Sequence, residues 1–170
     1  MVKGAVLLAV VVICGGVSSC AGDPPPRPSV ESFCDGACQG AARCGSSYQA
    51  CYSGCVSDPG NASLGSTRPE AAEVVGDCLT TLDCQTIFNG PYDACWAKAR
   101  AQTAPSDHLV AFCAPYSTNA FECGYWFSVE DCQTKLNIWT DKFLDRLAAC
   151  TQMASCADTD ACLEATFGSN

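Results

Sequence analysis

The chain has 170 residues, of which 18 are acidic and 9 are basic, and its net charge is −9. Binding to nucleic acids or to anionic membrane surfaces requires clustered basic residues, so the composition disfavours both classes of partner. The sequence also contains 16 cysteines. In an exported chain such a number indicates a framework of disulfide bonds.

The first nineteen residues are typical of an export signal. Lys3 supplies a positive charge, an apolar run extends from Ala5 to Cys14, and small residues follow it. The apolar run is shorter than the roughly 20 residues that a transmembrane helix needs. We therefore expect residues 1–19 to be removed as a signal peptide during export.

The residues Val17-Ser18-Ser19-Cys20 resemble the lipobox of bacterial lipoprotein precursors. The resemblance implies that the Cys20 thiol receives a diacylglyceryl group, that the signal is cut immediately before this residue, and that the new amino terminus is acylated. Ala21 is not the aspartate that marks inner-membrane retention in many such proteins, which favours the outer membrane. Ordinary secretion without lipid, after cleavage behind Ser19 or Ala21, is the alternative.

A proline-rich segment follows Cys20 and contains Pro24, Pro25, Pro26 and Pro28. In extended polyproline geometry, at about 3.1 Å per residue, it would hold a domain roughly 25 to 30 Å from the membrane. We assign residues 20–29 to a lipid anchor and tether that precede the folded body.

Internal similarity divides the body into two halves. The pattern Phe-Cys, nine residues and Cys-Gly begins at Phe33 and again at Phe112. Both halves also contain two cysteines six positions apart, at Cys78 and Cys84 and at Cys150 and Cys156. The shared order predicts duplication of an ancestral unit, with residues 30–103 and 104–170 as related halves.

The hydrophobic pattern of both halves is helical. Thr67, Pro69 and Glu70 are typical of a helix start, apolar positions then recur at steps of three and four from Val75 to Leu82, and Asn89-Gly90-Pro91 ends this helix. In the second half a cap at residues 128–131 precedes the helical spacing of Phe143, Leu147 and Cys150. We predict an all-α, disulfide-rich fold with two helical hairpins in each half.

The even number of cysteines in the body predicts seven disulfides. These residues are Cys34, Cys38, Cys44, Cys51, Cys55, Cys78, Cys84, Cys95, Cys113, Cys123, Cys132, Cys150, Cys156 and Cys162. Residues four apart share one face of a helix, so antiparallel helices would pair Cys34 with Cys55 and Cys38 with Cys51. This arrangement resembles the twin CX3C hairpin of small mitochondrial intermembrane chaperones, from which only the hairpin geometry is carried over.

The other pairings follow from symmetry between the halves, although sequence alone does not fix connectivity. We expect Cys113 to pair with Cys132, as the counterpart of the outer bond of the first hairpin. Within the later hairpins we expect Cys84–Cys95 and Cys156–Cys162. Between hairpins we expect Cys44–Cys78 and Cys123–Cys150.

The sequence contains no recognisable catalytic or metal-binding constellation. His108 is the only histidine, and its neighbours Ser106 and Asp107 cannot aim at one substrate atom with it, because they are adjacent in sequence. We expect Ser106 to cap a helix instead. No catalytic residue, cofactor or metal site is predicted.

These observations favour an exported, lipid-anchored envelope protein with a structural or partner-binding role and no enzymatic activity. A cysteine-rich copper or zinc protein is the alternative, because thiolates suit soft metals, and a secreted enzyme ranks last. The candidate contacts for an unknown envelope partner are Tyr125, Trp126 and Phe127, together with a bridge-free loop from Ser57 to Arg68.

Overall fold

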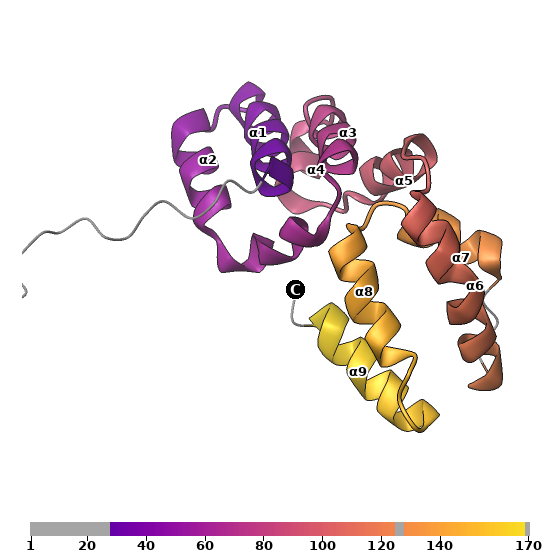
Figure 1. The fold of residues 1–170 in the computed structure, drawn as a ribbon. Coiled ribbons are helices and arrows are strands. Elements are labelled where there is room, and N and C mark those ends of the chain that lie inside the picture. Colours follow the sequence, from indigo (N-terminus) through magenta and orange to yellow (C-terminus); the bar gives the residue numbers. More distant parts are fainter. Residues whose placement is uncertain (1–27, 125–127, 169–170) are drawn as a thin grey trace, which may run out of the picture.

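The computed structural model describes residues 28–124 and 128–168, and these residues fold into nine α-helices and one 3-10 helix (Figure 1). The prediction of an all-α fold is confirmed for this part of the chain. The predicted signal peptide, the anchor Cys20 and the aromatic residues Tyr125, Trp126 and Phe127 lie outside the described residues. Residues 30–103 and 104–170 are called the first and second half below.

The first half is built around its first helix. Its elements are α1 (Pro28–Arg43), α2 (Tyr48–Ser57), the 3-10 helix η1 (Pro59–Ser66), α3 (Pro69–Leu79), α4 (Cys84–Asn89) and α5 (Asp93–Gln102). Helix α1 packs against α2, η1, α3 and α4, and α3 packs against α5. The prediction of four helices in this half is wrong, because it holds five α-helices and η1.

The second half consists of two helical hairpins that lie side by side (Figure 1). Helix α6 (Asp107–Glu122) pairs with α7 (Val129–Leu136), and α8 (Asp141–Cys150) pairs with α9 (Cys156–Gly168). The predicted cap at residues 128–131 is present as a capping box between Ser128 and Asp131. Phe143, Leu147 and Cys150 are fully buried on one face of α8, as their spacing predicts.

Helices α1 and α3 cross in backbone contact. A Cβ atom added at Gly36 would overlap the backbone of Gly76, and one added at Gly40 would lie 2.7 Å from the carbonyl oxygen of Leu79. Only glycine allows this approach, so the two glycines of α1 set the distance between the two helices.

The helix predicted from Thr67 to Asn89 is interrupted in the structure. Helix α3 ends at Leu79, and α4 begins after Asp83, whose side chain accepts a hydrogen bond from the Thr86 amide at 2.9 Å. The residue before α3 is Arg68, not Thr67, because Thr67 is buried in a backbone bridge with Trp139. Hydrophobic spacing continued across the break and did not reveal it.

Seven disulfides join all fourteen cysteines of the body. Three of the expected pairings are present, and they are Cys34–Cys55, Cys38–Cys51 and Cys113–Cys132. The four remaining predictions, Cys84–Cys95, Cys156–Cys162, Cys44–Cys78 and Cys123–Cys150, are wrong. The bonds formed are Cys44–Cys84, Cys78–Cys95, Cys123–Cys156 and Cys150–Cys162.

The break between α3 and α4 explains the change of partners in the first half. Because α4 is a separate helix that packs on α1, its first residue Cys84 lies beside Cys44 just after α1. Cys78 lies in the last turn of α3 and faces Cys95 of α5 instead. The predicted symmetry placed Cys84–Cys95 inside a second hairpin and Cys44–Cys78 between the two hairpins, and the first half does not contain that second hairpin.

A framework of seven disulfides is typical of proteins that fold in an oxidising compartment outside the cytoplasm. Within the part of the chain that the structure describes, no helix combines the length and the apolar character needed to cross a bilayer.

Candidate functional site at the junction of the halves

The two halves are joined by a short backbone pairing. Residues Thr67 and Trp139 form an isolated antiparallel bridge. The Arg68 amide donates to the Ile138 carbonyl oxygen at 2.8 Å, and the Thr140 amide donates to the Ser66 carbonyl oxygen at 2.9 Å. Ile138 belongs to the apolar core of the first half, and Trp139 packs against both cores. The segment after α7 is therefore built into the first half.

Arg68 reinforces this junction with its side chain. Its Nη1 donates to the carbonyl oxygens of Ala104 at 2.7 Å and Asn137 at 3.0 Å, and its Nη2 forms an ion pair with Glu70. One guanidinium group thus holds the segment between α5 and α6, called the linker here (residues 103–106), and the end of α7. Charge-assisted bonds of this kind are stronger than neutral ones.

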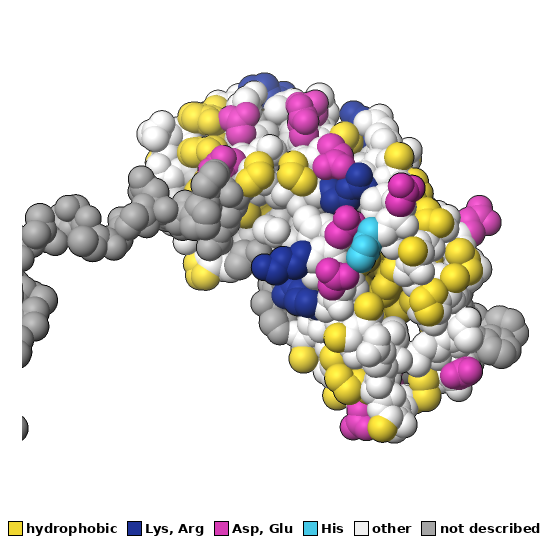
Figure 2. Space-filling model, viewed as in Figure 1, with side chains coloured by type: hydrophobic (Ala, Val, Ile, Leu, Met, Phe, Trp, Pro, Cys, Tyr) yellow, Lys and Arg dark blue, Asp and Glu magenta, His cyan; other side chains and the backbone are white. Residues whose placement is uncertain are grey.

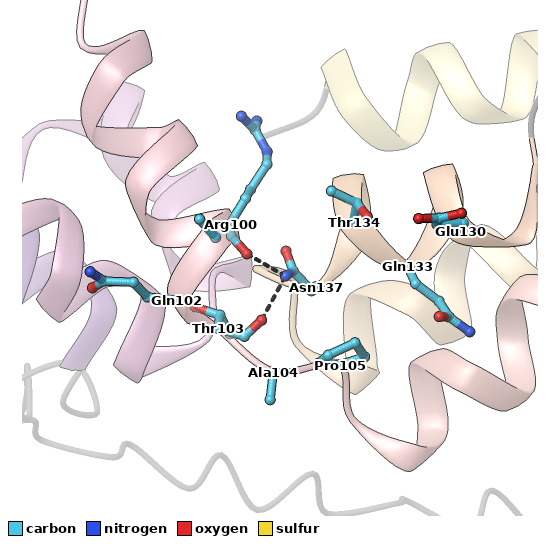
Figure 3. Close-up of a pocket in the computed structure, with 10 residues that line it drawn as sticks. Arg100, Gln102, Thr103, Ala104, Pro105, Glu130, Gln133, Thr134 and Asn137 are labelled. Carbon is cyan, nitrogen blue, oxygen red and sulfur yellow. Dashed lines mark hydrogen bonds between the residues drawn. The ribbon is translucent and has the colours of Figure 1, made fainter.

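Asn137 holds the same region with its side-chain amide. Its Nδ2 donates to the carbonyl oxygens of Arg100 at 2.7 Å and Thr103 at 2.6 Å (Figure 3). These carbonyls belong to the end of α5 and to the linker, where no amide of the same helix is available to donate to them. Two carbonyl acceptors fix the orientation of the amide, because its oxygen could not replace the nitrogen in either bond.

Beside Asn137 lies a cleft of about 450 Å³, called the junction cleft. It is lined by Arg100, Ala101, Gln102, Thr103, Ala104, Pro105, Glu130, Gln133, Thr134 and Asn137. Figure 3 shows that one wall comes from α5 and the linker and the other from α7. The lining carries one cation, Arg100, and one anion, Glu130, so it has no net charge.

Three buried polar atoms at this cleft have no hydrogen-bond partner. They are Asn137 Oδ1, Thr103 Oγ1 and Arg100 Nε, and the described residues contain one more, Ser117 Oγ on α6. Asn137 is 4% exposed and Thr103 is 6% exposed. Buried polar groups are nearly always paired, so this local concentration marks the junction cleft as the best candidate for a binding site.

The Ser106, Asp107 and His108 run does not assemble a triad. The Ser106 hydroxyl donates to Asp141 Oδ1 at 3.0 Å and accepts from the Leu109 amide at 3.1 Å, so its predicted capping role is confirmed. His108 Nε2 lies 3.1 Å from Asp145 Oδ1. Figure 2 shows the single histidine on the surface among acidic side chains. Serine and histidine therefore engage different carboxylates of α8.

The segment Ser57–Arg68 is not the loop that its composition predicted. Most of it forms η1, which packs against α1 and places the buried Leu64 beside Val30 and Cys34. Asp58 caps this short helix by accepting a hydrogen bond from the Gly60 amide at 2.8 Å. The end of the segment supplies Ser66, Thr67 and Arg68 to the junction.

The fourteen cysteines from Cys34 to Cys162 are committed to disulfides, and a disulfide sulfur is not the thiolate that soft metals require. In residues 28–124 and 128–168 no three side chains of His, Cys, Asp or Glu converge as a set of metal ligands.

Sequence reasoning did not identify the residues of the junction cleft. Asn137, Thr103 and Arg100 belong to no motif, and their proximity arises from tertiary contacts. The one signal available was an asparagine directly after Leu136, the last residue of α7, at a position where asparagine is common.

The chain matches no known family model, and no curated protein or solved structure is significantly similar to it. Its function is therefore inferred from its own residues.

Proposed function

We propose that the chain is an exported, lipid-anchored envelope protein that recognises a partner and performs no chemical reaction. The observation that carries this proposal is the complete pairing of fourteen cysteines in a helical body whose halves are locked together by Arg68 and Asn137. A scaffold that is already ordered loses little conformational entropy on binding, which suits recognition.

The anchor is Cys20, and the outer membrane is its proposed location. Labelling with a clickable fatty acid tests this point in the bacterial host. The variant Cys20→Ala should lose the label and accumulate as an uncleaved or mislocalised precursor. Cys14→Ala is the matched control, because it removes a cysteine of the signal and leaves the proposed acceptor intact. Equal labelling of wild type and Cys20→Ala would contradict the anchor.

The absence of catalysis is supported by the separation of Ser106 from His108, whose hydrogen bonds and ion pair lead to Asp141 and Asp145 respectively. A nucleophile needs a base within hydrogen-bond reach, and these two side chains are directed to different carboxylates. Hydrolytic turnover of any substrate in a broad screen would contradict the proposal.

Metal binding is the second candidate, and the state of the cysteines separates it from the first. The purified exported protein should contain no free thiol when it is denatured without reductant. Several free thiols together with bound copper or zinc would favour the metal protein. The disulfides of the structure support the first outcome.

We also propose that the halves arose by duplication. The order of the disulfides supports this proposal, because each disulfide of the second half has a counterpart in the first half. Cys34–Cys55, Cys44–Cys84 and Cys78–Cys95 correspond to Cys113–Cys132, Cys123–Cys156 and Cys150–Cys162. The bond Cys38–Cys51 belongs to the first half alone.

Partner recognition is tested by capture from envelope extracts with the tagged, oxidised protein. A variant with Tyr125, Trp126 and Phe127 replaced by serine should capture less partner than wild type. Phe88→Ser is the matched control, because Phe88 is an aromatic residue of α4 that is 53% exposed. No specific partner for the wild type would overturn the proposal. Loss of helical circular dichroism in the triple variant would assign the three aromatics to the core.

A further inference from the structure

We infer that the junction cleft binds a neutral polyhydroxylated ligand, of the class of short oligosaccharides, through hydrogen bonds. This inference rests on the proposed recognition role and gives it a site and a ligand class. It depends neither on the anchor nor on the aromatic residues 125–127.

The first argument is unused hydrogen-bonding capacity. Three of the four buried side-chain polar atoms without a partner in the described residues lie at this cleft, as an acceptor on Asn137, a donor on Arg100 and a hydroxyl on Thr103. In Figure 3 the Asn137 oxygen points away from the carbonyls that its nitrogen contacts. A ligand that both donates and accepts can satisfy all three groups.

Exposed side chains of the same lining add to this capacity. Among the described residues, no hydrogen bond involves the side chains of Gln102, Gln133 or Thr134. Gln102, Thr134 and Glu130 are exposed, whereas the three unpartnered atoms are shielded from solvent. The exposed groups would make the first contacts, and binding requires the lining side chains to turn aside before a ligand reaches the buried atoms.

The charge and polarity of the lining select the ligand class. Arg100 and Glu130 balance each other, which favours neither an anion such as phosphate nor a cation. The wholly apolar side chains of the lining are Ala101, Ala104 and Pro105; although apolar atoms make up the larger part of its exposed surface, these side chains are too short to enclose a lipid chain. Hydroxyl groups donate and accept at one atom, so a polyol matches a surface of mixed amides, hydroxyls and charges.

An extended peptide fits this cleft less well. Peptides that bind through their main chain pair with unpaired backbone groups, as at the edge of a sheet. Here the walls are helical, and the carbonyl oxygens of Thr103 and Ala104 already accept hydrogen bonds from Asn137 and Arg68. The volume of about 450 Å³ lies in the range of small-ligand sites, roughly 300–1,000 Å³.

The test is calorimetry with the oxidised exported protein, kept in a detergent without a sugar headgroup. The probes are chitotetraose and cellotetraose, with inorganic phosphate and tetra-alanine as the anion and peptide arms. We expect one of the two sugars to bind, and Gln133→Leu and Thr134→Val each to weaken that binding about fivefold, the effect of one lost neutral hydrogen bond. Gln49→Leu on the exposed face of α2 is the matched control and should bind like wild type.

Several results would overturn the inference. These are the absence of binding to both sugars at millimolar concentration, equal binding by the cleft variants and wild type, or binding of phosphate or tetra-alanine alone. If envelope capture still yields a partner while no sugar binds, the cleft assignment fails and the recognition role stands. If neither a partner nor a sugar binds, both fail.

Discussion

The Tyr48 hydroxyl donates a hydrogen bond of 2.6 Å to Asp35 Oδ1 and so links the start of α2 to the middle of α1. This bond raises the pKa of Tyr48 from its ordinary value of 10.0 to about 12, since ionisation of the phenol would remove the proton that Asp35 accepts. This solvent-exposed hydrogen bond adds to the two disulfides that hold the α1–α2 hairpin, Cys34–Cys55 and Cys38–Cys51.

The hydrogen bond between Tyr48 and Asp35 predicts that the stability of the fold depends on pH in the alkaline range. Because the pKa of Tyr48 is higher in the folded than in the unfolded chain, its contribution to stability is complete below about pH 10 and is lost as the pH rises toward about 12. Asp35→Ala should return the Tyr48 pKa toward 10.0, measured by NMR titration of the ring resonances. Asp77→Ala on α3 is the control, and an unchanged pKa in Asp35→Ala would contradict the assignment.

The crossing of α1 and α3 predicts opposite effects for one substitution at two glycines. Gly36→Ala forces a Cβ into the backbone of Gly76 and should lower the free energy of unfolding by about 1–3 kcal/mol or more. Gly54→Ala lies in α2 with no atom within 4 Å and should raise it by about 0.5–1 kcal/mol, as in an open helix interior. Denaturant unfolding of the oxidised protein measures both. Destabilisation of similar size at both positions would argue against the close crossing.

The two hydrogen bonds of the Asn137 side chain should contribute measurably to the free energy of unfolding. Asn137→Ala leaves the carbonyl oxygens of Arg100 and Thr103 without their donor and should cost roughly 2–4 kcal/mol of unfolding free energy. Gln133→Ala, one turn earlier on α7, is the control and should change stability by less than about 0.5 kcal/mol. Thermal or chemical unfolding supplies the comparison, and equal stability of the two variants would rule out Asn137 as a lock.

The corrected disulfides predict a specific peptide map. Cleavage before Asp77, Asp83 and Asp93, in the denatured but unreduced chain, places Cys78, Cys84 and Cys95 on separate peptides. The Cys78 peptide should be linked to the Cys95 peptide, and the Cys84 peptide to the one that holds Cys44. Mass spectrometry before and after reduction reads this directly. A link between the Cys84 and Cys95 peptides would refute the connectivity.

The sequence predicted those parts of the fold that are encoded locally. The capping box at Ser128 depends on residues within one helical turn, and the bonds of the first hairpin follow from cysteines four positions apart. The break before α4 was missed, although Asp83 in front of Cys84 is a typical helix start. Continued apolar spacing concealed it, and the symmetry used for the later pairings assigned Cys84 and Cys78 the wrong partners.

The candidate site was not predictable for a different reason. Arg68 and Asn137 bind backbone carbonyls, and every residue offers a carbonyl, so no side-chain pattern identifies the partner. The bridge between Thr67 and Trp139 likewise consists of a backbone pairing. The junction cleft emerges only when α5, the linker and α7 are brought together in space.

All seven disulfides close loops within residues 34–95 or 113–162, so the single stretch of chain from 96 to 112, which contains the linker, is the sole covalent connection between the two cross-linked regions. A chain nicked at Ala104 would therefore behave as a split protein. Its two fragments would remain associated in native buffer through Arg68 and the bridge at Thr67, and they would part in denaturant with every cross-link intact. Expressed as separate chains, the fragments would report on the affinity of one half for the other.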